Sequence, residues 1–219
     1  MAWHNKNTGA YAEGTTEFDE NCNEIWHVLE PLGWTKNAVA AICGNFAHEG
    51  GMNPWRWESD NVLNYGNPAI ATSRTNGYGL AQFTPPGKYI LDSRAQALSG
   101  YGPNYSDVTG SNSDGEAQVL FIDQYADYIP TSACPMTYAE FKASTGDPYY
   151  LAEVWVRNYE RPAVIDDNTK RIRGNSALYV FGILGGIYIK KGVLALLNNK
   201  GGFDGNIQRR WLFRRSRNR

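Results

Sequence analysis

The sequence predicts a mainly helical fold with a small, irregular loop or strand region. Apolar residues recur at the spacing of a helix face in several segments, and stretches rich in glycine, proline and asparagine separate those segments. The composition, with 42% apolar and 20% charged residues, is that of an ordinary globular protein. The length of 219 residues suits one substantial core and is too short for two full domains.

The first two helices are expected over residues 18–32 and 35–49. Gly33 ends the first helix, and Thr35 is a good N-cap for the second. Apolar residues mark one face of the first helix: Cys22, Ile25, Trp26, Leu29 and Leu32. A short link therefore joins the two helices in a tight hairpin.

The middle of the chain alternates loops with shorter helices. Residues 50–76 have the glycine, proline and asparagine content of a loop or a small irregular strand region, and residues 99–113, rich in glycine, serine, asparagine and tyrosine, are predicted as a loop. Between them, residues 77–85 form a glycine-rich turn that enters a short helical segment near Lys88. Further helices are predicted over residues 113–128, 136–143, 147–159 and 170–184. Asp147 and Pro148 are typical of a helix start, and Gly185-Gly186 closes the last helix.

We divide the chain into an N-terminal arm (residues 1–17), a helical domain (18–184) and a basic tail (185–219). The tail holds nine Lys or Arg residues and one acidic residue, Asp204, so its formal net charge is +8. Because the whole chain has a net charge of −1, the remaining residues together carry −9. This asymmetry predicts that the tail meets an anionic partner or docks on another protein, with Trp211, Leu212 and Phe213 as its apolar contacts.

No cofactor, metal or membrane span is expected. The three cysteines, Cys22, Cys43 and Cys134, have no metal-binding spacing and are interpreted as core residues. All three histidines lie at or before position 48 and lack the spacing of a zinc site. Lysines and a glycine pair interrupt the apolar run 177–197, which leaves neither part long enough to cross a bilayer.

Glu49 is the candidate catalytic residue. It follows Ile42 by seven positions and Phe46 by three, so a helix would place it on the same buried face. Burial and the partial negative charge of a helix C-terminus both favour the protonated carboxyl group, which a general acid requires. The alternative is a glutamate that reaches solvent from a helix end.

Three motifs, over residues 44–54, 77–85 and 158–162, read GNFAHEGGMNP, GYGLAQFTP and NYERP. Together and in this order they resemble the phage tail lysozyme family, over residues 18–184. The resemblance implies a lysozyme-like fold, in which helices and a small irregular β or loop region flank a glycan cleft. It also implies cleavage of the β-1,4 bond between N-acetylmuramic acid and N-acetylglucosamine in bacterial peptidoglycan, with Glu49 as the acid.

The same resemblance implies a set of residues that bind or shape the glycan cleft. These are Asn53, Trp57, Tyr78, Gln82 and Phe83. Two of them have a structural alternative: Gln82 could be a hydrogen-bond partner of the local backbone, and Trp57, like Trp55, could pack in the core.

A second carboxylate would stabilise the positive charge that develops on the sugar ring during glycoside cleavage, unless the acetamido group of the substrate does so. Glu58 and Asp60 are candidates, with solvated loop charges as the alternative. Glu160 and Arg161 are interpreted as structural residues whose charged groups connect the ends of helices. The alternative is a second catalytic pair.

The predicted location is a phage tail, where the enzyme opens the cell wall at infection. The N-terminus lacks a signal-peptide pattern, so synthesis in the host cytoplasm is expected. The predicted partners are peptidoglycan and other tail or virion proteins, the latter through the basic tail. No specific nucleic acid is expected, because no recognised binding module is present. Two alternatives remain open: a lytic transglycosylase giving anhydro products, and a tail-tip structural or glycan-binding protein with an inactive domain.

Overall fold

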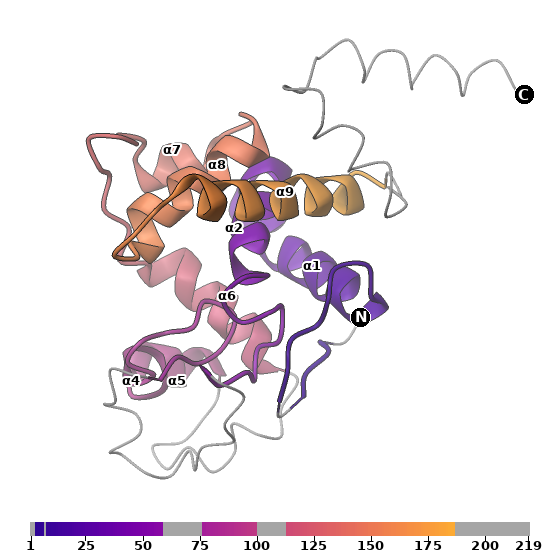
Figure 1. Ribbon diagram of the computed structural model, residues 1–219. Helices are drawn as coiled ribbons and strands as arrows, with labels where there is room; N and C mark the ends of the chain where they lie inside the picture. Colours follow the sequence, from indigo (N-terminus) through magenta and orange to yellow (C-terminus); the bar gives the residue numbers. More distant parts are fainter. Residues whose placement is uncertain (1–2, 7, 59–75, 100–112, 187–219) are drawn as a thin grey trace, which may run out of the picture. The chain divides into compact units, whose positions relative to one another are not determined.

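The computed structural model describes residues 3–6, 8–58, 76–99 and 113–186, all within the first of the two units of the chain, residues 1–187. The mainly helical fold class is confirmed (Figure 1). The helices are α1 (Thr16–Leu29), α2 (Lys36–Phe46), α4 (Gly87–Ile90), α5 (Ser93–Ser99), α6 (Ser113–Tyr125), α7 (Tyr138–Ala143), α8 (Pro148–Trp155) and α9 (Asp167–Leu184). A 3₁₀ turn, Glu30–Leu32, follows α1, and a π-helical turn, Val156–Glu160, follows α8.

The central helix is α2, which packs most extensively against α9 and next against α8. Figure 1 shows α9 lying across α2, with α7 and α8 beside it. Residues 38–46 of α2 are all buried. Gly44 permits this packing, because a Cβ atom there would lie 2.6 Å from the backbone nitrogen of Ala177 in α9. The two helices therefore approach backbone to backbone at the residue five positions before Glu49.

Residues 76–83 are irregular and include the glycine-rich turn that the sequence predicted over 77–85; of the irregular region predicted over 50–76, residues 59–75 lie outside the described residues. Antiparallel bridges join Tyr78 to Trp57 and to Phe83. An aromatic cluster contains Tyr78, Tyr89, Phe83 and Phe121, and the hydroxyl groups of its two tyrosines contact the buried carboxylate of Asp114 on α6. Asp114 accepts hydrogen bonds from the Tyr78 hydroxyl and, at 2.9 Å, from the Tyr89 hydroxyl. A buried carboxylate thus joins the loop region to α6.

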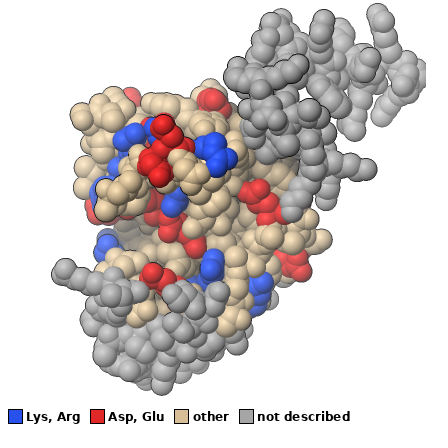
Figure 2. All heavy atoms as spheres, in the orientation of Figure 1, with Lys and Arg blue, Asp and Glu red and all other residues tan. Residues whose placement is uncertain are grey.

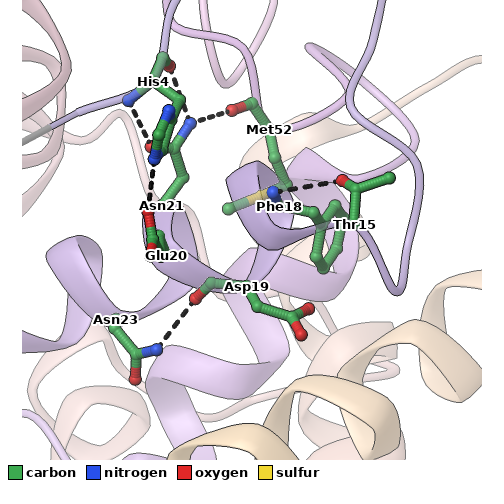
Figure 3. Close-up of polar contacts among 8 residues, drawn as sticks. All are labelled: His4, Thr15, Phe18, Asp19, Glu20, Asn21, Asn23 and Met52. Carbon is green, nitrogen blue, oxygen red and sulfur yellow. Dashed lines mark hydrogen bonds and ion pairs between the residues drawn. The ribbon is translucent and has the colours of Figure 1, made fainter.

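The segment expected as an N-terminal arm packs on the helical body. Trp3 is 7% exposed, and Thr16 already belongs to α1. Asn21 of α1 accepts a hydrogen bond from the His4 backbone N–H (2.8 Å) and donates to the carbonyls of His4 (2.8 Å) and Met52 (2.7 Å) (Figure 3). The arm is thereby connected to the chain just beyond Glu49.

Asn53 makes a second connection to the arm. Its buried amide donates to the carbonyls of Lys6 (2.8 Å) and Gly9 (2.9 Å), and its oxygen accepts from the Trp55 N–H (3.1 Å). A backbone hydrogen bond from Tyr11 to the Gly51 carbonyl (2.8 Å) lies alongside. Residues 50–55 are therefore held from one side by the arm.

We expect Asn53→Ala to lower the free energy of unfolding by about 1–3 kcal/mol, because it removes the buried amide that donates to the part-buried carbonyls of Lys6 and Gly9. Denaturant unfolding followed by circular dichroism measures the loss. Asn37→Ala is the matched control, since Asn37 also donates to two carbonyls, those of Thr145 and Gly146, at exposed positions. Equal losses in the two variants would contradict the role given to Asn53.

Candidate active site

Glu49 lies in a turn directly after α2 and not in the helix itself. The helix ends at Phe46, three residues earlier than the apolar spacing indicated. The turn is held by the Glu49 N–H, which donates to the carbonyls of Asn45 (3.1 Å) and Phe46 (3.2 Å). Gly50 lets the turn approach the glycine-rich loop, because a Cβ there would lie 2.2 Å from the Gly79 carbonyl oxygen. The Gly50 N–H donates to the Leu80 carbonyl (3.1 Å) at this contact.

A polar cleft of about 270 Å³ opens beside this turn. Its lining comes from the turn, the segment after it and the glycine-rich loop: His48, Glu49, Arg56, Glu58, Gln82 and Thr84. The Glu49 side chain is 23% exposed, so it is accessible from the cleft yet partly withdrawn from water. The cleft combines an acid with hydrogen-bonding side chains, as a site for a hydroxyl-rich ligand requires.

Arg173 of α9 forms an ion pair with Glu49. The guanidinium group also donates to the Asn45 side-chain oxygen at 3.1 Å, and the residue as a whole is only 8% exposed. Asn45 in turn donates to the carbonyls of Ala41 (2.9 Å) and Ala152 (3.2 Å). Helices α2, α8 and α9 therefore together fix the position of the cation beside Glu49.

Glu160 at the end of the π-helical turn belongs to the same charged cluster. Its carboxylate accepts a hydrogen bond from Trp155 Nε1 at 3.0 Å. Burial and then the nearby charge of Glu49 raise the pKa of Glu160 to about 8, although Arg173 opposes the increase. The raised pKa favours the protonated form of Glu160. Arg161, its neighbour, turns away to pair with Asp127 at 2.6 Å.

His48 extends the network toward the N-terminal arm. Its Nε2 atom lies 2.9 Å from the Ser176 hydroxyl, which donates to Glu13 of the arm. Burial and the charge of Arg173 lower the pKa of His48. The imidazole is thus neutral at pH 7 and adds no second cation beside Glu49.

The candidate substrate-binding residues occupy two different environments. Gln82 lines the cleft with a positive φ of 46°, and its amide donates to the Gly79 carbonyl at 2.9 Å. Four others are buried and are not among the residues that line the cleft: Asn53, Trp57, Tyr78 and Phe83. The indole of Trp57 packs on Tyr78 at 4.8 Å and Phe83 stacks on Tyr89 at 5.0 Å, so these aromatic rings belong to the hydrophobic core.

Of the two candidate second carboxylates, Glu58 lines the cleft and is exposed, whereas Asp60 lies outside the described residues. The sequence reasoning missed Arg56, Thr84 and Arg173. A signal for Arg173 exists: it shares a helical face with Ala177, Val180 and Leu184, and a lone cation on a small apolar face indicates a buried partner.

Three described non-glycine residues adopt left-handed backbone conformations, and one of them lines the cleft. The described residues include three non-glycine positions with positive φ, namely Met52 (54°), Gln82 (46°) and Arg161 (49°). Met52 follows the Glu49 turn, Gln82 lines the cleft and Arg161 follows Glu160. Such conformations persist where the surrounding structure enforces them, which is common at functional sites.

Two other kinds of site are not found in the described part of the chain. No group of three or more His, Cys, Asp or Glu side chains there is placed to hold a metal ion. Among the described helices, none combines the length and apolar character needed to cross a bilayer. On the face shown in Figure 2, acidic and basic side chains are mixed, which does not favour binding to a uniformly charged polymer.

A mainly helical domain with an acid at the edge of a polar cleft is the arrangement of a lysozyme-like domain. The sequence pattern of the phage tail lysozyme family matches residues 20–184, and the chain belongs to this family. It is also 31% identical over 175 residues to Morphogenesis protein 1 of Bacillus phage B103. That match covers 78% of this chain and 40% of the relative, so the chain spans less than half of the relative's length.

Proposed function

We propose that this protein is a peptidoglycan-degrading glycosidase of a phage virion, which cleaves the β-1,4 bond between N-acetylmuramic acid and N-acetylglucosamine. The observation that carries the proposal is the position of Glu49, which is accessible from the cleft and held by α2, α9 and the glycine-rich loop. Membership of the phage tail lysozyme family supports both the substrate class and the location in a phage tail.

Glu49 acts as the general acid in the proposed reaction. Its proton passes to the glycosidic oxygen, the bond from that oxygen to the anomeric carbon breaks, and positive charge develops on the sugar ring. Glu58 lines the same cleft and is a candidate for stabilising this charge or orienting a water molecule. The alternative is that the substrate's acetamido group attacks the anomeric carbon, and no second carboxylate is then needed.

Mass spectrometry of muropeptides tests the proposal. Purified peptidoglycan is incubated with the protein, and the products are reduced with borohydride before analysis. Reducible N-acetylmuramic acid ends identify a hydrolase, and anhydro ends identify a lytic transglycosylase. If no soluble products form and the protein still binds the polymer, the protein is a glycan-binding protein and not an enzyme. The relative's name, Morphogenesis protein 1, favours a role in virion assembly as the second candidate function.

The basic tail is proposed to dock the enzyme and not to act in catalysis. Residues 187–219 lie outside the described residues, and α9 ends at Leu184. We expect a chain ending at Gly185 to fold and to digest purified peptidoglycan at the rate of the full chain. It should lose binding to virion proteins or another anionic partner, with the largest difference at low salt. An insoluble or inactive truncated chain would show that the tail belongs to the fold.

A further inference from the structure

The guanidinium group of Arg173 contacts two residues through its two terminal nitrogens. Nη2 pairs with Oε1 of Glu49, and Nη1 donates to the Asn45 side-chain oxygen at 3.1 Å. The Nε–H group is buried and has no hydrogen-bond partner among the described residues. Arginine often binds a carboxylate through two parallel hydrogen bonds, one to each oxygen. Arg173 instead contacts Glu49 through a single nitrogen and a single oxygen.

This contact leaves the second oxygen of Glu49 available to a ligand. In the described part of the chain no hydrogen bond to Oε2 is found, and the Glu49 side chain is 23% exposed where it lines the cleft. The cation is held in place from the other side, because the buried Asn45 that accepts from it also donates to the carbonyls of Ala41 and Ala152. The two oxygens of Glu49 therefore have different surroundings.

The two oxygens of a protonated carboxyl group are also chemically different. One carries the proton and donates a hydrogen bond, whereas the carbonyl oxygen is the better acceptor. A guanidinium group offers donors only and stays charged at any pH at which the protein works. A protonated Glu49 therefore keeps its contact with Arg173 best when its proton is on Oε2.

We propose that Arg173 selects the oxygen of Glu49 that carries the proton. Oε1 accepts from Arg173 whether Glu49 is ionised or protonated, and Oε2 delivers the proton to the glycosidic oxygen. This inference rests on the proposed role of Glu49 as the general acid. Arg173 is a positioning residue, because it acts on the substrate only through Glu49.

Protons balance over one turnover. The Oε2–H bond breaks as its proton passes to the glycosidic oxygen, and the bond from that oxygen to the anomeric carbon breaks with its electron pair staying on the oxygen. Glu49 is then an anion, which Arg173 stabilises without moving because the contact already exists. A water molecule, or a sugar hydroxyl group in a transglycosylase, next bonds through its oxygen to the anomeric carbon. The proton of that water or hydroxyl group returns to Oε2.

The pH–rate profile reports on this contact, because a cation beside a carboxyl group favours its ionised form. The other charged or titratable groups around Glu49 lie outside α9 and remain when Arg173 is replaced: His48, Arg56, Glu58, Tyr159 and Glu160. Besides burial, the charge of Arg173 lowers the pKa of His48, and it opposes the increase that burial causes in the pKa of Glu160. Each profile is therefore repeated with His48→Gln and with Glu160→Gln.

Arg173→Met tests the inference, because it removes the charge and the donors but keeps a long side chain. On the acidic side of the profile kcat should fall at least about 10-fold, since the anion of Glu49 loses its stabilising donor. The alkaline limb should move to higher pH, because loss of the cation favours the protonated acid. The fold-loss in kcat should therefore shrink as the pH rises. An alkaline limb at the wild-type position would overturn the proposal.

Two further variants separate the charge from the loss of a buried ion pair. Arg173→Lys keeps a cation but lacks the rigid fork of donors, so its alkaline limb should stay near that of the wild type, with a smaller loss in kcat than in Arg173→Met. Arg157→Met is the matched control, since Arg157 is also partly buried and pairs with Glu153 at 2.8 Å. It should leave the profile unchanged. An equal shift in either variant would overturn the proposal.

A measurement on the wild-type protein needs neither a folded variant nor activity. Nitrogen-15 NMR should show slowly exchanging Nη2 protons of Arg173 both below and above the pH at which the carboxyl carbon of Glu49 titrates. Loss of these protons when Glu49 is protonated would overturn the proposal. Absence of peptidoglycan cleavage by the wild type would instead refute the proposed function and leave the NMR titration as the test of the contact.

Discussion

Glu49→Gln is expected to reduce peptidoglycan cleavage by at least about a hundredfold while the fold is retained. Glutamine has nearly the shape of glutamate, but it cannot donate a proton to the glycosidic oxygen, and loss of a general acid typically costs this much. Release of soluble muropeptides per unit time measures the change, and circular dichroism checks the fold. A variant with near wild-type activity and an unchanged spectrum would remove Glu49 from the mechanism.

Glu58→Gln is the companion variant, because both carboxyl groups line the same cleft. A loss as large as that in Glu49→Gln assigns the second catalytic carboxylate to Glu58. A loss of less than about 10-fold favours participation by the substrate's acetamido group and leaves Glu58 as a surface charge of the cleft. The pair of variants thus distinguishes the two mechanisms left open by the sequence.

Gly44→Ala is expected to destabilise the protein and to lower its activity together. The added methyl group would lie 2.6 Å from the Ala177 nitrogen and 2.7 Å from the Arg173 carbonyl oxygen, and both are backbone atoms that cannot rotate away. Helices α2 and α9 must then separate, which costs about 1–3 kcal/mol in a packed core. Because these helices carry the Glu49 turn and Arg173, kcat should fall as well.

The control for this variant is Gly146→Ala, at an exposed glycine. There the nearest neighbour of the added Cβ is the Ser144 hydroxyl oxygen at 3.2 Å, a side-chain atom that can rotate. Thermal or denaturant unfolding should show a change of less than about 0.5 kcal/mol, as for most surface substitutions. Similar losses at Gly44 and Gly146 would show that close packing of α2 on α9 is not what Gly44 provides.

Helix locations were predictable because the apolar spacing that marks each helix is local. The caps confirm this: Thr35 accepts from the Ala38 N–H at 3.2 Å, and Asp147 accepts from the Tyr149 N–H at 3.0 Å. The predicted end of α2, at Glu49, was three residues too late, because a contact distant in the sequence ends the helix at Phe46. Gly50 contacts Gly79 and so fixes the turn that carries Glu49, and the spacing of apolar residues does not predict such a contact.

In the site, too, local sequence signals were predictable and contacts between distant residues were not. Glu49, Glu58 and Gln82 line one cleft, and their roles in binding and cleaving a glycan remain predictions. Tyr78 was expected near the glycan, yet its hydroxyl binds Asp114, a partner 36 positions away. Arg173 lies 124 positions from Glu49. Pairings over such distances are determined by helix packing, so a single sequence cannot reveal them.

The bridge from Glu13 through Ser176 to His48 has a consequence for biosynthesis. Its first contact joins residues 163 positions apart, and Arg173 also arrives only with the last helix. A nascent chain that has released the cleft-lining residues still lacks the cation beside Glu49 until α9 leaves the ribosome. Contacts of such high sequence separation form late, because closing a long loop costs entropy before any contact repays it. The charged cluster around Glu49 is therefore assembled only after almost the whole family domain has been synthesised. Proteolysis of the chain between residues 49 and 173 would place Glu49 and Arg173 on separate fragments.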